Sequence, residues 1–242
     1  MDALYVSPCH APSPAPLPPG ADTLAILLPG AYGTPEDFLR EGFAAAVAER
    51  HLPLDLALAD APVSLYSDGA VFGQLRDDLM HPARQRGYRH IWLVGISLGG
   101  LASLAYAARH ENAAEAAPDG VLALAPYLGN RAITGAIAAV GGVAGWTPPA
   151  LGEDDVEFQV WAWLKGYGNP GGHRAALPLH LGYGRDDRFS AGHRLMADAL
   201  PAGRVLAVAG GHDWPTWRTL WQGLLDRDAL GLATRPALGA TA

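Results

Sequence analysis

Short apolar runs alternate along this chain with segments that have the residue pattern of helices. Six runs are typical of strands, at 24–28, 54–58, 91–94, 121–125, 177–183 and 204–209, and five segments are typical of helices, at 34–50, 69–86, 101–110, 190–200 and 215–225. A continuous apolar run is expected of a strand buried on both faces, and a helix between two such strands returns the chain so that the strands lie parallel. The alternation therefore predicts an α/β domain, a mainly parallel sheet with helices on both faces.

The domain boundaries follow from where this alternation starts, breaks and stops. Residues 7–20 hold six prolines, so we expect residues 1–21 to form an extended lead-in with no core of its own. The core is expected at 22–127 and 177–228, followed by a tail at 229–242. The segment 128–176 between two predicted strands is too long for a plain connection, and it predicts a small insertion beside the sheet.

Charge and composition exclude several classes of function. The chain has 242 residues, 50% of them hydrophobic, and a formal net charge of −7 at pH 7. Because a negative protein repels phosphates, we expect neither a nucleic-acid partner nor binding to a membrane surface. The single cysteine, Cys9, cannot form an internal disulfide, and residues 1–20 lack the cationic start and the apolar run of a secretory signal. These features predict a cytoplasmic protein.

A G-x-S-x-G motif lies between the run at 91–94 and the helix at 101–110. In Gly95-Ile96-Ser97-Leu98-Gly99 the two outer glycines allow a sharp turn that exposes the serine hydroxyl at the end of a strand. The turn also places Ser97 at a helix N-terminus, where developing negative charge is favoured, and directs the Leu98 N–H to the same place. Ser97 is therefore the candidate nucleophile, and Leu98 is a candidate donor to an oxyanion.

A nucleophilic serine needs a histidine to take its proton and a carboxylate to orient that histidine. His212 follows the run at 204–209, and Asp187 follows the run at 177–183. Both are therefore expected at the sheet edge that carries Ser97, because the carboxyl ends of parallel strands meet there. Asp186 is the alternative acid, and Asp213 is expected to be a loop or helix-cap residue.

The other histidines are weaker candidates for the base. His173, in the insertion, and His180, in a predicted strand, are the main rivals of His212. His81, His110 and His193 lie in or at the ends of predicted helices, and we expect them on the surface.

The turn around Ser97, with Asp187 and His212 following in that order, resembles the α/β-hydrolase family over roughly residues 22–228. The resemblance implies the α/β-hydrolase fold, whose sheet has eight strands in many members. We therefore expect about six to eight strands, with the first two either missing or near residues 4–6. The resemblance also implies that the loop after the first full strand supplies a second oxyanion N–H, from Ala31 or alternatively from Tyr32.

The insertion at 128–176 occupies the position of the cap in members of that family. Aromatic residues in and around it are candidates to line an apolar pocket. The candidate substrate-binding residues are Tyr32, Tyr127, Trp146, Trp161 and Trp214. The alternative is that these aromatics only pack the insertion onto the domain. The sequence has no metal-ligating motif, no phosphate loop and no basic pocket for phosphate or coenzyme A, so we expect no metal and no cofactor.

These residues predict a serine hydrolase that cleaves carboxylic esters of small to medium apolar acyl or alcohol groups through an acyl-enzyme intermediate. The expected partner is the small-molecule ester substrate. An acyltransferase or thioesterase with the same three residues is an alternative, because water and other acyl acceptors can use the same nucleophile. A non-catalytic binding protein on a hydrolase fold is a third hypothesis, since a fold alone does not establish activity.

Overall fold

The computed structural model describes residues 1–7, 10–67, 69–113, 115–152, 154–167 and 177–233. Within these residues a single sheet contains eight strands, in the order β2-β1-β4-β3-β5-β6-β7-β8. The strands are β1 Ala3–Ser7, β2 His10–Ser13, β3 Thr23–Leu28, β4 Asp55–Ala59, β5 His90–Ile96, β6 Gly120–Leu124, β7 Leu179–Gly184 and β8 Val205–Val208. The six strands β3 to β8 pair in parallel and correspond to the six predicted runs. The predicted α/β class with a mainly parallel sheet is confirmed.

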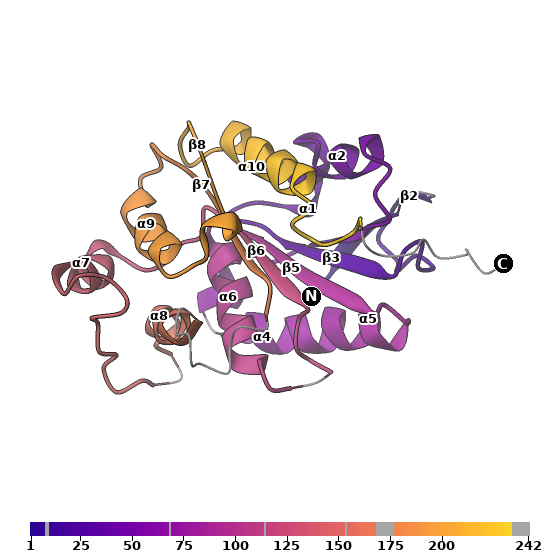
Figure 1. The fold of residues 1–242 in the computed structure, drawn as a ribbon. Coiled ribbons are helices and arrows are strands. Elements are labelled where there is room, and N and C mark those ends of the chain that lie inside the picture. The colour runs from indigo at the N-terminus through magenta and orange to yellow at the C-terminus, as the bar shows by residue number, and fades with distance from the viewer. Residues whose placement is uncertain (8–9, 68, 114, 153, 168–176, 234–242) are drawn as a thin grey trace.

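Helices cover both faces of the sheet, as predicted (Figure 1). The α-helices are α1 Pro35–Arg40, α2 Phe43–Glu49, α3 Val63–Ser67, α4 Ala70–Gln74, α5 His81–Gln85, α6 Leu98–His110, α7 Arg131–Ala139, α8 Val156–Tyr167, α9 Ser190–Asp198 and α10 Trp214–Asp226. A π-helical stretch, Leu75–Met80, joins α4 to α5, and a short 3-10 helix, Ala202–Arg204, precedes β8. On one face lie α1, α2 and α10, and on the other lie α4, α5, α6 and α8 (Figure 1).

The single helix expected at 34–50 is divided into α1 and α2. Gly42 lies between them with φ 79°, a left-handed conformation that glycine adopts without steric cost. The break lets Phe38 and Phe43 both turn toward the sheet, where their rings meet edge to face at 5.2 Å. Both side chains are fully buried, together with Trp221 of α10. The turn at Gly42 thus adds apolar area to this face of the core.

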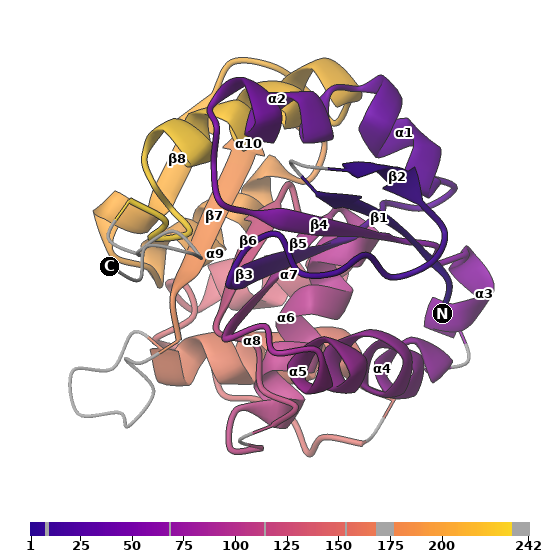
Figure 2. The same cartoon turned by 90° about the vertical axis from the view of Figure 1, so that its right-hand side faces the viewer.

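The described residues near both ends of the chain join the domain, which differs from the lead-in expected at 1–21 and from a tail that begins at 229. β1 covers residues 4–6, where a first strand was one of the two expectations. β1 pairs antiparallel with β4, and β2 pairs with β1 at the edge of the sheet (Figure 2). An edge strand tolerates proline because its outer N–H groups need no partner in the sheet, so β2 can contain Pro12. At the other end, Leu230 and Leu232 are buried against the face that carries α10.

Residues 128–167 form α7 and α8 and the loops beside them. Trp161 of α8 is fully buried, and its indole N–H donates to the Leu128 carbonyl oxygen at 2.8 Å. Trp146 stacks on Phe158 at 6.1 Å between ring centres. Helix α8 thus covers the sheet beside α6, whereas α7 lies near α9 (Figure 1).

Candidate active site

Ser97 lies in the turn between β5 and α6, with φ 52° and ψ −111°. Glycine is required on both sides of it for steric reasons. A Cβ on Gly95 would collide with the Gly99 carbonyl group, and a Cβ on Gly99 would collide with the Leu28 carbonyl oxygen. The backbone is held in place because the Ser97 N–H donates to the Leu124 carbonyl oxygen at 3.0 Å. The G-x-S-x-G pattern therefore holds a strained serine at the carboxyl end of the central strand.

The loops after β7 and β8 bring Asp187 and His212 to this serine. His212 Nε2 lies 2.8 Å from Ser97 Oγ, and His212 Nδ1 lies 2.7 Å from Asp187 Oδ2. These contacts are satisfied when Nδ1 carries the proton and donates to Asp187, which leaves Nε2 to accept from the serine hydroxyl. The three side chains thus form one chain of hydrogen bonds from a carboxylate to a hydroxyl.

Asp187 is fixed more firmly than either of the neighbouring acids. It is 3% exposed, and its Oδ1 accepts the Phe189 N–H at 2.8 Å. Burial raises the pKa of Asp187, but the hydrogen bonds from His212 and from the Phe189 N–H outweigh burial, so the pKa lies below its ordinary value. Asp187 is therefore ionised at neutral pH, as a partner for the Nδ1 proton must be.

Asp186 and Asp213 have other partners. Asp186 is exposed and accepts the Gly210 N–H at 3.3 Å. Asp213 accepts the Thr216 N–H at 3.0 Å and caps the N-terminus of α10. The hydrogen bond to the histidine is thus made by Asp187, and Asp213 is the helix cap that was expected.

Two aromatic rings enclose His212. Phe189 meets the imidazole edge to face at 5.0 Å, and Trp217 does so at 5.1 Å. Phe189 is not among the candidate residues that the sequence analysis names. Its only signal was its place two residues after Asp187, where the same turn that fixes the acid also directs the ring at the histidine.

The loop after β3 passes directly beside Ser97. A Cβ on Gly30 would lie 3.3 Å from the Ser97 Cβ, and the loop closes in a turn in which the Gly33 N–H donates to the Gly30 carbonyl at 3.0 Å. Ala31 lies in this turn, next to Gly30. Tyr32 follows at φ 64°, with its side chain 91% exposed. Across from the loop, Leu98 is the first residue of α6, so its N–H has no partner within the helix.

The five candidate substrate-binding residues lie in different places. Tyr127 is beside the nucleophile: its N–H donates to the Ser97 carbonyl oxygen at 2.8 Å, and it lines a cavity of 350 Å³ together with Leu98. Trp146 and Trp161 are buried in the packing of α8. Trp214 packs edge to face on Phe38 at 5.8 Å and on Phe43 at 6.0 Å, in the layer formed by α1 and α2, and Tyr32 is largely exposed. Packing thus accounts for the contacts of the three tryptophans.

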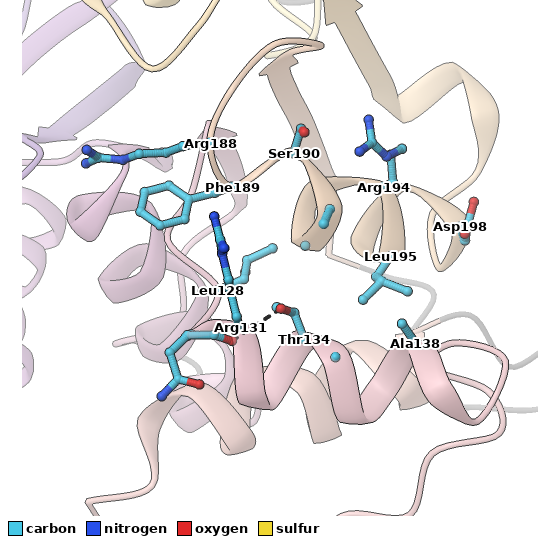
Figure 3. Close-up of a pocket in the computed structure, with 15 residues that line it drawn as sticks. Leu128, Arg131, Thr134, Ala138, Arg188, Phe189, Ser190, Arg194, Leu195 and Asp198 are labelled. Carbon is cyan, nitrogen blue, oxygen red and sulfur yellow. Dashed lines mark hydrogen bonds between the residues drawn. The ribbon is translucent and has the colours of Figure 1, made fainter.

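A second cavity, of 650 Å³, lies between α7 and α9, and Phe189 is one of its lining residues (Figure 3). Leu128 and Leu195 contribute apolar walls, and Arg131, Arg188 and Arg194 contribute guanidinium groups. No basic pocket was expected from the sequence, and no local pattern predicts this one, because its arginines are separated along the chain.

Two of the other histidines have hydrogen-bond partners other than Ser97. His193, expected on the surface, is fully buried in α9, where its Nε2 lies 2.9 Å from the Pro126 carbonyl oxygen. Burial lowers the pKa of His193 to about 4. His180 in β7 accepts from Arg204 Nη1 at 2.8 Å, and burial lowers its pKa to about 4 as well. His173 lies outside the described residues.

The described residues contain neither a metal-binding cluster nor a membrane-spanning helix. Among them, no group of three or more histidine, cysteine, aspartate or glutamate side chains is arranged to hold a metal ion. Within the same part of the chain, none of the helices combines the length and the apolar character needed to cross a bilayer.

Solved structures with the same architecture are numerous, although the sequences differ widely. An S-formylglutathione hydrolase from Staphylococcus aureus superposes with a TM-score of 0.57 at 13% identity, over 87% of this chain and 82% of that chain. A ferulic acid esterase gives 0.55 at 17% identity, over 84% of each chain. A fluorophosphonate-binding serine hydrolase from Staphylococcus aureus gives 0.55 at 11% identity, over 91% of this chain and 86% of that chain.

Neither the models of known protein families nor the curated proteins contain a match to the sequence. The fold is nevertheless established by the strand order, the helices on both faces and the superpositions. This chain has the α/β-hydrolase fold.

Proposed function

We propose that this protein is a serine hydrolase that cleaves carboxylic esters through an acyl-enzyme intermediate. The observation that carries the proposal is the hydrogen-bonded chain from Asp187 through His212 to Ser97, with 2.7 Å and 2.8 Å between the bonded atoms. A serine hydroxyl becomes a strong nucleophile when a positioned base takes its proton during attack. Structures of an S-formylglutathione hydrolase and a ferulic acid esterase, which share the fold, support the same class of reaction.

In the first half of the reaction, Ser97 Oγ attacks the ester carbonyl carbon while its proton moves to His212 Nε2. Asp187 stabilises the imidazolium that forms and keeps its Nδ1 proton in place. The tetrahedral intermediate then collapses: the bond between the carbonyl carbon and the alcohol oxygen breaks, and the leaving oxygen takes the proton from Nε2. The alcohol departs, and the acyl group stays on Ser97.

In the second half, water replaces the alcohol. Nε2 takes a proton from the water as its oxygen attacks the acyl carbon, and the bond to Ser97 Oγ breaks as Oγ regains a proton from Nε2. The products are a carboxylic acid and the original enzyme. Both halves need the same histidine first as base and then as acid, which requires that Nε2 be the nitrogen that faces the serine.

The negative oxygen of each tetrahedral intermediate is assigned to the Leu98 and Ala31 N–H groups. The first residue of α6 carries a free N–H, and the turn at Gly30 brings Ala31 beside the serine. Each such donor contributes about 3–4 kcal/mol to transition-state stabilisation in well-characterised hydrolases.

The proposed substrates carry a small to medium apolar acyl or alcohol group. The cavity of 350 Å³ that contains Leu98 and Tyr127 is the support for this choice. Its walls include Val71, Phe72 and Leu101, which offer no fixed polar donors to such a group. A volume of this size matches a short or branched chain better than a long fatty acid.

The test is hydrolysis of 4-nitrophenyl esters of increasing acyl length by the wild-type protein and by Ser97→Ala. We expect a maximum in kcat/KM at short to medium acyl chains, and a loss of at least about a thousand-fold in the variant. The variant should unfold at a similar temperature, since it removes one oxygen atom. Turnover that survives Ser97→Ala would refute the assignment, and a folded wild-type protein without any turnover would favour the binding-protein hypothesis.

A further inference from the structure

We propose that the cavity between α7 and α9 binds a carboxylate group of the ester substrate, while the apolar end of the substrate lies in the other cavity. This inference rests on the proposed function, because it places one end of the same substrate. It assigns the substrate to a chemical class: esters in which one end is apolar and the other carries a negative charge.

The Tyr127 and Phe189 rings link the residues that line the two cavities to His212. Phe189 forms a wall of the basic cavity and contacts the His212 ring at 5.0 Å and the Tyr127 ring at 5.4 Å. Tyr127 in turn lines the apolar cavity. Leu128 and Gly129, which follow Tyr127 directly, line the basic one. A substrate held at Ser97 can therefore extend into either cavity along the Tyr127 and Phe189 rings.

Two of the arginines that line the basic cavity lie beside Phe189 (Figure 3). Figure 3 shows Arg131, at the N-terminus of α7, pointing toward Phe189, with Arg188 beside the same ring. The Arg188 guanidinium lies 4.8 Å from the centre of the Phe189 ring. Across the described parts of the chain, neither arginine has an ion pair with a carboxylate. In a chain with a net charge of −7, two unneutralised guanidinium groups beside an active site point to an anionic ligand.

Two other polar residues of this cavity already have hydrogen-bond partners. Asn130 Oδ1 accepts the Ala132 and Ile133 N–H groups, and the Thr134 hydroxyl donates to the Asn130 carbonyl oxygen. At the far end, Arg194 and Asp198 lie on the same helix and balance each other in charge (Figure 3). The net positive charge therefore lies at the Phe189 end, where guanidinium groups suit the planar, two-oxygen geometry of a carboxylate.

The apolar cavity carries the opposite charge at its border. Asp154 and Glu157 are among its lining residues. Glu157 also marks the boundary between the cavities, because a Cβ on Gly129 would lie 3.4 Å from its Cβ. An anionic group is repelled from this side and attracted to the other, which gives a charged ester one preferred orientation.

The test compares neutral and anionic esters of matched shape. In the first pair, phenyl acetate is neutral and 4-acetoxybenzoate carries a carboxylate on the alcohol side. In the second pair, phenyl butanoate is neutral and monophenyl succinate carries a carboxylate on the acyl side. In at least one pair, we expect the double variant Arg131→Gln/Arg188→Gln to lower kcat/KM for the anionic ester about ten-fold more than for the neutral one, from two exposed charge contacts. Arg89→Gln, which removes a charge at an exposed position that lines neither of the two cavities, is the control and should keep the selectivity.

A binding measurement separates failure of this inference from failure of the proposed function. In Ser97→Ala protein, calorimetry should show that 4-hydroxybenzoate or succinate binds more tightly than its amide, 4-hydroxybenzamide or succinamide, and that the double arginine variant loses the difference. If carboxylates bind but the wild-type protein hydrolyses no ester, the carboxylate site stands and the proposed hydrolase function is refuted. If the protein hydrolyses esters but the double variant lowers kcat/KM equally for neutral and anionic esters, the proposed hydrolase function stands and the carboxylate site is refuted.

Discussion

The turns after β5, β7 and β8 and the cavities around them are built in different ways. In the turns, Ser97 and Asp187 are buried, each is held by backbone hydrogen bonds, and glycines fill the places where a side chain would collide. In the basic cavity, Arg131 and Arg188 are exposed and come from separate segments. We therefore expect the buried, geometrically fixed groups to determine whether any ester reacts, and the exposed charges to determine which ester reacts.

The largest expected effect is a contrast between two adjacent acids. Asp187→Asn should lower kcat by about four orders of magnitude for every ester, because an amide no longer holds the histidine proton on Nδ1. Asp186→Asn should leave kcat within about two-fold of the wild-type value, since surface changes away from the reacting groups have small effects. The measurement is steady-state hydrolysis of 4-nitrophenyl butyrate. Equal losses in the two variants would remove the distinction between the buried and exposed positions.

Stability separates two glycines in the same way. Gly99→Ala should lower the free energy of unfolding by about 3 kcal/mol or more, because the new methyl group meets the Leu28 carbonyl oxygen. Gly73→Ala is the control: this glycine lies in α4 with nothing within 4 Å of an added Cβ, so the change should stabilise the protein by about 0.5–1 kcal/mol. Urea unfolding followed by tryptophan fluorescence measures both. A Gly99→Ala protein as stable as wild type would show that the turn is not sterically constrained.

Lowering the pH should change the free energy of unfolding through a buried histidine, whereas the arginines stay charged. Burial lowers the pKa of His193 to about 4, so between pH 6.5 and 4 the unfolded chain binds a proton that the folded chain does not. The free energy of unfolding therefore falls as pH falls through this window, by about 3 kcal/mol for this histidine. His193→Asn should be less stable than wild type at pH 7 but should lose less stability on going to pH 4.5. An unchanged pH dependence in urea unfolding would contradict the burial of this side chain.

The smallest expected effect concerns the acidic border. Glu157→Gln should raise kcat/KM for anionic esters about two-fold and leave kcat/KM for neutral esters unchanged, because it removes one half-buried like charge near the substrate. Glu115→Gln, at an exposed position that lines neither of the two cavities, is the matched control. The comparison is made at low ionic strength, and 0.5 M salt should abolish it. If kcat/KM rises for neutral esters as well, the substitution acts by changing the shape of the cavity and not its charge.

The core fold and the meeting of Ser97, Asp187 and His212 were predictable from the sequence for a common reason. Each lies in the turn after a predicted parallel strand, and the carboxyl ends of such strands converge on one edge whatever the rest of the chain does. The catalytic roles of the three residues remain predictions that the variants above test.

Features that depend on packing were not predictable. β2 is a short edge strand in a proline-rich segment, where apolar periodicity is weak. β1 lies between β2 and β4 and covers residues 4–6, where the resemblance allowed a strand. His193 has polar neighbours in α9, so its burial follows only from where that helix packs. The basic cavity exists because α7 lies beside α9, and no local pattern links Arg131 to Arg188.

The most direct test of the central claim is labelling with a fluorophosphonate, which reacts with serines that a neighbouring base has activated, followed by peptide mapping. The account predicts one adduct, on Ser97, in the wild-type protein and none in Ser97→Ala. Asp187→Asn should label far more slowly than Asp186→Asn. A folded wild-type protein that forms no adduct, or forms it on another serine, would contradict the assignment of Ser97 as the activated nucleophile.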